Sequence, residues 1–312
     1  MKDTHNHNNH GHTHHHVQSG KNLFITIILN IIITIAQITG GIFSGSLALL
    51  SDALHNFSDV MSLVIAWWAK RISLKENSEE KTFGYKRAEI LAALFNASLL
   101  AGIGLYLIIE GIHKFLNPQV IESSIVIYLA ILSIVLNAAS VLLIKDDAHD
   151  NLNMKAAYLH LLTDVMTSVA VLIGGIGMYY MNLFWIDPLI SIAIAVYLIK
   201  SSYSLIKEST GILMQFSPSY VTVKMVEDRI LKVQEINNVH HMHLWNLDDK
   251  SIFLEAHINF KEDLMLSKMS IILEKIEKDL QKNLDIAHVT LQAEFDKSDS
   301  KELIYNKGCY HV

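Results

Sequence analysis

Long apolar stretches separated by short polar segments make up the first two thirds of the chain. Six of these stretches reach the roughly 18 residues that a helix needs to cross the hydrocarbon core of a bilayer. Beyond about residue 207 the charged residues return, and no later stretch is long enough to span a membrane. The pattern predicts six membrane-spanning helices followed by a polar domain. The predicted spans are residues 22–43, 47–69, 88–112, 121–144, 156–180 and 185–206.

The polar domain has the pattern of mixed helices and strands. Within residues 251–260 and 287–295 apolar and polar side chains alternate, as in a strand with one buried face. This alternation places His257 and Glu294 on polar strand faces. We therefore expect an α-helical membrane protein with six transmembrane helices and a C-terminal α+β domain. The expected elements of that domain are helix 219–235, strand 239–247, strand 251–260, helix 264–283 and strand 287–295.

Composition narrows the possible classes of protein. The chain is 51% hydrophobic and only 18% charged, with a mean hydropathy of +0.31, which argues against a single soluble enzyme. Its net charge of −6 argues against a protein that binds nucleic acid through an excess of basic residues. The single cysteine excludes an internal disulfide framework and a cysteine-based structural zinc site.

The distribution of lysine and arginine predicts the orientation in the membrane. The loop between the second and third predicted spans carries six such residues, whereas the loops at 44–46, 113–120 and 181–184 contain only Lys114. Because positive loops face the cytoplasm, both termini and the polar domain are expected there. Without a cleavable signal peptide or an organelle signal, a bacterial inner membrane is the simplest location. The expected domains are a tail at 1–20, a membrane domain at 21–206, a cytoplasmic domain at 207–296 and a tail at 297–312.

Histidines are unusually frequent, and most of the 17 fall into three groups. Seven lie within the first 16 residues, in a tract that alternates with Asn, Gly and Thr. Such a tract is expected to be disordered and to bind zinc weakly. Five histidines lie in the polar domain, and only His55 and His160 lie inside predicted spans.

The two membrane histidines belong to a repeated octapeptide. Residues 54–61 and 159–166 are identical at five of eight positions, and each contains the pattern H-x-x-x-D. His55 and Asp59, like His160 and Asp164, lie one helical turn apart on one face. Two such faces packed together provide two nitrogens and two carboxylates, which suits a tetrahedral transition-metal ion. Ionisable groups at membrane depth are costly and mark function, although a structural hydrogen bond within each pair is the alternative.

Four sequence segments carry a resemblance to a known family. They are SLALLSDALHNFSD at 46–59, TFGYKRAEIL at 82–91, NLNMKAAYLH at 151–160 and HLW at 243–245. In this order they resemble the cation diffusion facilitators, specifically the bacterial cobalt–zinc–cadmium efflux branch and its animal zinc-transporter relatives. The resemblance covers about residues 20–295.

The resemblance implies a homodimer whose cytoplasmic domain has the order αββαβ and is related to ferredoxin. It also implies export of Zn²⁺ in exchange for protons, with the metal as substrate and without a prosthetic group. The implied transport site is His55, Asp59, His160 and Asp164. Members with His at the first of these positions resemble zinc-preferring ones, so Zn²⁺ is the expected substrate, with Cd²⁺ and Co²⁺ as alternatives.

The resemblance also maps a regulatory zinc site onto His240, His257 and Glu294 in the cytoplasmic domain, where Gln292 replaces a histidine of some members. His241 and His243 have the opposite strand parity to His240, so they are alternative ligands, and His288 is a possible additional one. The other interpretation is that these side chains form solvated strand faces.

Two departures from relatives concern the loop at 70–87. This loop contains no histidine, so a loop zinc site found in some relatives is not expected here. Relatives of another branch pair a lysine at the position of Arg87 with an acid, but Gln215 occupies the matching position here. Arg87 is then left to bind either Glu89 or a lipid headgroup.

The role of Asp52, a polar residue beside the repeat, has two possible interpretations. Asp52 lies three residues before His55 and either relays protons or forms a helix-end hydrogen bond.

A membrane-bound zinc hydrolase or a metal sensor is the alternative to a transporter. Against the hydrolase, the sequence has neither an H-E-x-x-H helix nor a nucleophile elbow.

Overall fold

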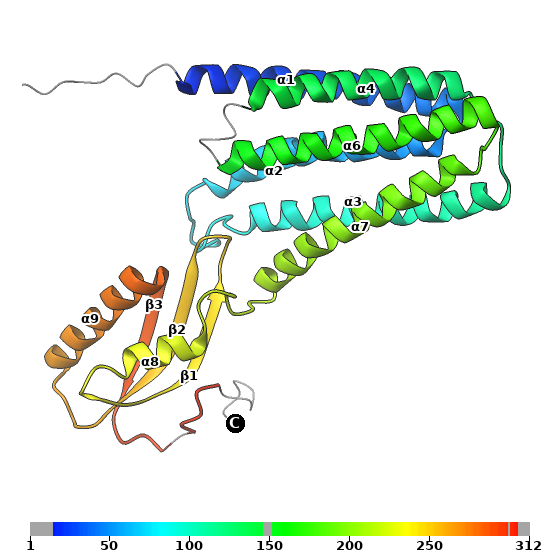
Figure 1. Ribbon diagram of the computed structural model, residues 1–312. Helices are drawn as coiled ribbons and strands as arrows, with labels where there is room; N and C mark the ends of the chain where they lie inside the picture. The colour runs from blue at the N-terminus through cyan, green and yellow to red at the C-terminus, as the bar shows by residue number, and fades with distance from the viewer. Residues whose placement is uncertain (1–14, 146–151, 299, 305–312) are drawn as a thin grey trace, which may run out of the picture. The chain divides into compact units, whose positions relative to one another are not determined.

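Among the residues that the structure describes, six long helices occupy the predicted apolar stretches (Figure 1). The structure is a computed structural model that describes residues 15–145, 152–298 and 300–304. It divides into two units, of which one contains residues 1–64 and 96–203 and the other contains 65–95 and 204–312. The long helices are α1 (His15–Ser44), α2 (Leu47–Ser73), α3 (Ala88–Leu116), α4 (Ser123–Ile144), α6 (Leu152–Met181) and α7 (Ile186–Leu213).

Five of the helices in the described part of the chain, α1, α3, α4, α6 and α7, are long and apolar enough to cross a membrane. The exception is α2, which has 27 residues but carries Asp52, His55, Asn56 and Asp59 in its first half. These polar side chains lower its hydropathy, so the sixth span stays a prediction. Of the six long helices, the least apolar is therefore the one that carries half of the candidate site.

Helix ends extend past the predicted limits. α1 begins at His15, so residues 15–20, assigned above to the tail, are helical. α7 continues to Leu213, seven residues beyond the predicted end of the span at 206. Both extensions follow from helix propagation, which adds one hydrogen bond for each further residue once a helix has formed. The rest of the histidine tract, residues 1–14, lies outside the described residues.

Side chains from five helices pack together in the interior of the first unit. Its buried cluster takes Leu49 from α2, Leu107 from α3, Ala130 from α4, Met178 from α6 and Leu198 from α7. All five are at most 1% exposed. Figure 1 shows α1 running alongside α4. Since membrane helices associate through close packing rather than hydrophobic burial, this interlocked cluster fixes the positions of α2 and α6.

The start of α2 is held by an acid from another helix. Asp187, in the first turn of α7, accepts hydrogen bonds from the backbone N–H groups of Leu47 and Ala48, at 2.7 and 3.3 Å. It also accepts one from the hydroxyl of Ser46, at 2.5 Å. The first N–H groups of a helix lack partners within the helix, and an acid there also interacts well with the helix dipole. Asp187 therefore fixes the helix that carries His55 and Asp59.

The C-terminal domain contains α8 (Val223–Ile230), β1 (Ile236–Asn246), β2 (Ile252–Phe260), α9 (Leu266–Leu284) and β3 (Ile286–Glu294). This is the expected order, and the relation to ferredoxin stays a prediction. The strand order is β1-β2-β3, with β1 and β2 antiparallel and β2 and β3 parallel. The apolar positions of β2 form the centre of the domain core together with Ile230, Ile276 and Leu280.

α8 is much shorter than the predicted helix 219–235. The hydroxyl of Thr222 accepts a hydrogen bond from the backbone of Met225 and so caps the start of the helix at Val223. The helix ends at Ile230, and a turn in which the N–H of Val233 bonds to the carbonyl of Ile230 leads into β1. The apolar residues that suggested a longer helix belong partly to this turn.

Candidate metal sites

α2 and α6 each carry one His–Asp pair, and the two pairs meet. Within α2, the Nδ1 of His55 lies 3.6 Å from the Oδ2 of Asp59. Between the helices, the Nε2 of His55 lies 3.6 Å from the Oδ1 of Asp164. The Nε2 of His160 lies 3.1 Å from the Oδ2 of Asp59 and 3.9 Å from the Oδ2 of Asp164. The four side chains singled out by the sequence repeat therefore lie together.

These separations fit a metal ion better than they fit hydrogen bonds. Of the four contacts, only that between His160 and Asp59, at 3.1 Å, is within hydrogen-bonding distance. Two ligands bound tetrahedrally to one zinc ion at about 2.0–2.1 Å lie roughly 3.4 Å apart. One ligand atom each from His55, His160 and Asp164 lies within 4.8 Å of the other two, and the carboxylate of Asp59 flanks this set. A structural hydrogen bond accounts for only one of the four contacts.

Burial divides the cluster into two halves. His55 is 5% exposed and Asp164 is fully buried, whereas the side chains of His160 and Asp59 are 40% and 26% exposed. Both ring nitrogens of His55 and both carboxylate oxygens of Asp164 are buried without a hydrogen bond among the described residues. Each such atom costs about 1–3 kcal/mol, and more if it is charged. A cation bound between the two residues would satisfy one ring nitrogen of His55 and the carboxylate of Asp164.

Asp52 lies beside this cluster but has a different environment. It is 1% exposed and accepts hydrogen bonds from Gln37 on α1, at 2.6 Å, and from Thr167 and Ser168 on α6, at 2.8 and 3.2 Å. The amide of Asn56 donates in turn to Gln37, at 3.1 Å. Asp52 therefore joins three helices and is not limited to a bond at a helix end. Whether it also relays protons stays a prediction.

The second predicted ligand set also comes together, in the C-terminal domain. His240 on β1 is paired in the sheet with His257 on β2. The Nε2 of His240 lies 3.2 Å from the Oε2 of Glu294, and the Nδ1 of His257 lies 2.9 Å from its Oε1. Ligand atoms of the three residues lie within 4.8 Å of one another. Burial lowers the pKa of His257, which favours the neutral imidazole that a metal requires.

Glu294 has further partners that the sequence did not predict. The ammonium group of Lys297 lies 2.5 Å from its Oε1, and that of Lys301 lies 3.7 Å from its Oε2. Gln292 also donates to its Oε1, at 2.7 Å. Both lysines lie in the segment predicted to be a tail, 297–312, so the prediction that the cytoplasmic domain ends at residue 296 is wrong for these two residues. A metal ion at this carboxylate has to compete with them, and the only signal in the sequence is their position directly after the last strand.

An irregularity in β1 changes which strand face His241 and His243 occupy. A bulge lies between His240 and His243, and His241 has a positive φ of 49° within it. As a result the His241 ring stacks on that of His257, with centroids 4.7 Å apart, so the expected separation by parity was wrong. His243 contacts His241, at 5.1 Å between centroids. His288 is paired with Phe253 and lies outside the metal-compatible set.

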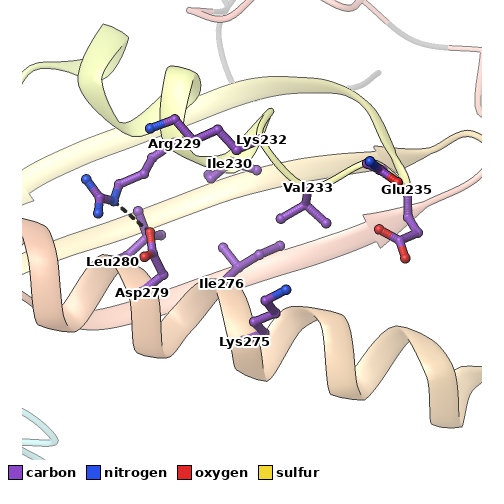
Figure 2. A pocket seen from close by; sticks show the side chains of 10 residues that line it. Arg229, Ile230, Lys232, Val233, Glu235, Lys275, Ile276, Asp279 and Leu280 are labelled. Atoms are coloured by element: carbon purple, nitrogen blue, oxygen red, sulfur yellow. Dashed lines mark hydrogen bonds and ion pairs between the residues drawn. The ribbon is translucent and has the colours of Figure 1, made fainter.

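A cavity of about 460 Å³ between α8 and α9 has a different chemistry. Figure 2 shows the guanidinium of Arg229 directed at Asp279 across this cavity. The two side chains form an ion pair at 2.6 Å. Two carboxylates, Glu235 and Asp279, line this cavity, and neither belongs to the two metal-compatible groups found among the described residues.

Comparisons with known proteins cover nearly the whole chain. The family model for the cation efflux transmembrane domain matches residues 23–214, and that for the cytoplasmic domain of cation efflux proteins matches residues 218–296. A cadmium, cobalt and zinc/H(+)-K(+) antiporter of Bacillus subtilis is 36% identical, over 90% of this chain and 91% of its own. The zinc transporter ZitB of Pectobacterium atrosepticum is 32% identical, over 95% and 93%. The metal cation efflux system protein CzcD of Cupriavidus metallidurans is 33% identical, over 88% and 86%.

The hydrogen bonds around Asp52 can be tested with two threonines of α6. Thr167→Val removes a donor to the buried carboxyl group, so the free energy of unfolding should fall by about 1–2 kcal/mol. Thr163 lies one turn earlier, is partly buried and donates an exposed hydrogen bond to the carbonyl of Leu159. Thr163→Val should therefore change stability by less than about 0.5 kcal/mol. Thermal unfolding in detergent, followed by tryptophan fluorescence, measures both, and equal losses would contradict the network.

Proposed function

Since the chain belongs to the cation efflux family, in the branch that handles zinc, cadmium and cobalt, we propose that it exports Zn²⁺ from the cytoplasm in exchange for protons. The proposed transport site is His55, Asp59, His160 and Asp164. The family is one of transporters, and this argues against the zinc hydrolase alternative. The observation that carries the proposal is the convergence of these four side chains from α2 and α6.

The ligand types favour zinc. Two imidazoles and two carboxylates suit a borderline metal that accepts nitrogen and oxygen in a tetrahedral arrangement. Cd²⁺ and Co²⁺ are further candidate substrates, because the Bacillus subtilis relative is named for cadmium and cobalt as well as zinc.

Proton exchange follows from the chemistry of the same atoms. An imidazole binds a metal only when it is neutral, and a carboxylate only when it is ionised, so zinc and protons compete for the site. An imidazole in water titrates near pH 6.5, within the range that a bacterium meets on the two sides of its membrane. Protons arriving from the outside therefore favour release of zinc and are carried inward after it leaves.

The unequal burial of the four side chains also supports a site that solvent reaches from one side. His160 and Asp59 are half-exposed, so an ion reaches them first and then exchanges its remaining water for the buried His55 and Asp164. The uncompensated nitrogens and oxygens of this buried half provide the driving force. Alternating access then requires that one helix group moves against the others and opens the same site to the opposite side.

We assign His240, His257 and Glu294 to a regulatory zinc site in the cytoplasmic domain. The three ligand atoms lie close enough to share an ion, and Lys297 and Lys301 compensate the charge of Glu294 in its absence. We further propose that the protein is a homodimer in the inner membrane with both termini in the cytoplasm. The match to the cytoplasmic domain of cation efflux proteins supports the dimer.

Transport should depend on the buried half of the site. Asp164→Asn and His55→Ala each remove a ligand, and zinc uptake should fall by at least about 100-fold, more than is usual for changes outside the ligand shell. The measurement is zinc uptake into proteoliposomes driven by an imposed pH gradient.

Glu110→Gln is the matched control, since it removes a carboxylate from membrane helix α3 outside the cluster. It should leave uptake close to wild type. Undiminished, gradient-coupled flux in both site variants would show that zinc passes through other residues.

Selectivity should depend on His55. His55→Asp changes the site to one nitrogen donor and three carboxylates, and the ratio of cadmium to zinc uptake should rise several-fold because the imidazole that favours zinc is lost. Competition between the two metals in proteoliposomes measures this ratio. His113→Asp places the same substitution in the last turn of α3, away from the cluster, and should leave the ratio unchanged. The proposal that His55 selects the metal fails if both variants keep the wild-type ratio.

A further inference from the structure

A second cavity lies where two candidate membrane spans end. It has a volume of about 380 Å³. Ala88 and Leu91, in the first turn of α3, form part of its wall, and Gln215 lies two residues beyond the end of α7. Both helices are long and apolar enough to cross a membrane, so their ends mark the level of the lipid headgroups. The lining residues are Phe83, Gly84, Tyr85, Lys86, Arg87, Ala88, Leu91, Gln215, Trp245 and Leu247.

The charged groups in this cavity are both cationic. Lys86 and Arg87 line it, and no acidic residue does so among the residues that the structure describes. Arg87 donates from Nε to the carbonyl of Leu247, at 3.3 Å, and its other guanidinium N–H groups form no hydrogen bond within the described chain. Lys86 likewise has neither a hydrogen bond nor an ion pair there. Two cations with unused donors therefore face one cavity.

The nearest acids are bound to other groups. Glu89, one of the two expected partners of Arg87, accepts instead from Lys70, at 3.2 Å, and from Ser73, at 2.6 Å. Asp248 accepts from the backbone N–H groups of Lys250 and Ser251, at 3.0 and 2.7 Å. Partial burial acts to raise the pKa of Asp248, but these bonds and the charge of Lys86 keep it below its ordinary value. Among the described residues, no carboxylate therefore forms an ion pair with Lys86 or Arg87.

The rest of the wall is mainly apolar and aromatic. Phe83 and Trp245 line the cavity and both contact Phe253, with ring centroids 5.6 and 5.8 Å apart. Two more cations surround Tyr85, since the ammonium groups of Lys75 and Lys81 lie 5.9 and 5.2 Å from its ring centre. Aromatic rings beside lysine and arginine are typical of the membrane–water boundary.

We propose that this cavity binds the headgroup of an anionic phospholipid. Lys86 and Arg87 bind the phosphate, and Phe83, Leu91 and Trp245 pack against its glycerol and the first acyl carbons. An amphiphilic ligand is favoured over a soluble anion, because the cations are set in an apolar wall at the end of two membrane spans. Basic side chains near a membrane attract anionic lipids. The inference rests on the position of these helix ends in a membrane and is independent of the transport site.

The cavity of Figure 2 provides the contrast and the control. It is lined by Arg229, Lys232 and Lys275, but Asp279 and Glu235 line it as well, and Arg229 pairs with Asp279. Its cations are therefore largely compensated. Removing two lysines from it changes the net charge of the chain as much as removing Lys86 and Arg87 does.

Native mass spectrometry of the full chain, delipidated in detergent and titrated with phosphatidylglycerol or phosphatidylcholine, tests the proposal. The wild type should retain phosphatidylglycerol in preference to phosphatidylcholine. The double variant Lys86→Gln/Arg87→Gln should bind phosphatidylglycerol roughly 10- to 30-fold more weakly, as expected for two lost cation contacts. The control Lys232→Gln/Lys275→Gln should bind it as the wild type does. Zinc flux is not the readout, so failure here leaves the transport proposal intact.

Two further measurements separate loss of lipid binding from misfolding and from binding of a soluble anion. Lys86→Gln alone disturbs no hydrogen bond and should still weaken binding if the double variant does not fold, and Arg87→Lys should retain it. Glycerol phosphate at millimolar concentration should not displace the lipid. The proposal is overturned if the two lipids bind equally, if the charge-removing variants retain phosphatidylglycerol, or if glycerol phosphate displaces it, since a soluble anion would then be the ligand.

Discussion

A carboxyl group inside a membrane domain loses the water that would solvate it, and the protein has to replace that solvation. In the first unit, three buried aspartates differ in the groups that take the place of this water. Asp187 accepts hydrogen bonds from the backbone at the start of α2, and Asp52 accepts three from side chains of α1 and α6. Asp164, equally buried, accepts none among the described residues, and the imidazoles of His55 and His160 lie 3.6 and 3.9 Å from its carboxylate. Of the three, Asp164 is the one whose environment is suited to a cation.

This difference links the scaffold to the proposed function. The hydrogen bonds of Asp187 and Asp52 fix the first two turns of α2, so His55 and Asp59 are held in place before any ion arrives. Preorganised ligands lose little entropy on binding, while the uncompensated atoms of His55 and Asp164 keep the site attractive to cations. The cytoplasmic cluster is built differently, because Lys297 and Gln292 already bind Glu294. A metal bound there would have to displace these partners, which is consistent with the regulatory role proposed for this site.

Features that follow from helix or strand periodicity could be predicted from the sequence. Features that depend on contacts between distant segments could not. Residues one helical turn apart must share a face, so the repeat predicted the grouping of His55, Asp59, His160 and Asp164, which the geometry reproduces. Strand alternation likewise predicted the buried positions of β2. The family resemblance, rather than alternation, predicted the grouping of His240, His257 and Glu294. Alternation could not predict the bulge that brings His241 against His257. Nor could it show that Lys297 and Lys301 fold back onto Glu294, because that depends on the path of the chain after β3.

The central claim is that two imidazoles and two carboxylates from α2 and α6 bind one zinc ion. X-ray absorption at the zinc edge tests it most directly. The protein used should lack residues 1–16 and carry His257→Ala and Glu294→Ala, so that zinc bound to the histidine tract or to the cytoplasmic cluster does not contribute to the spectrum. The account predicts four nitrogen and oxygen neighbours at about 2.0–2.2 Å, with the outer-shell scattering of two imidazoles. His160→Ala should reduce that scattering to one imidazole. A six-oxygen shell without imidazole scattering, or a spectrum unchanged by His160→Ala, would contradict the claim.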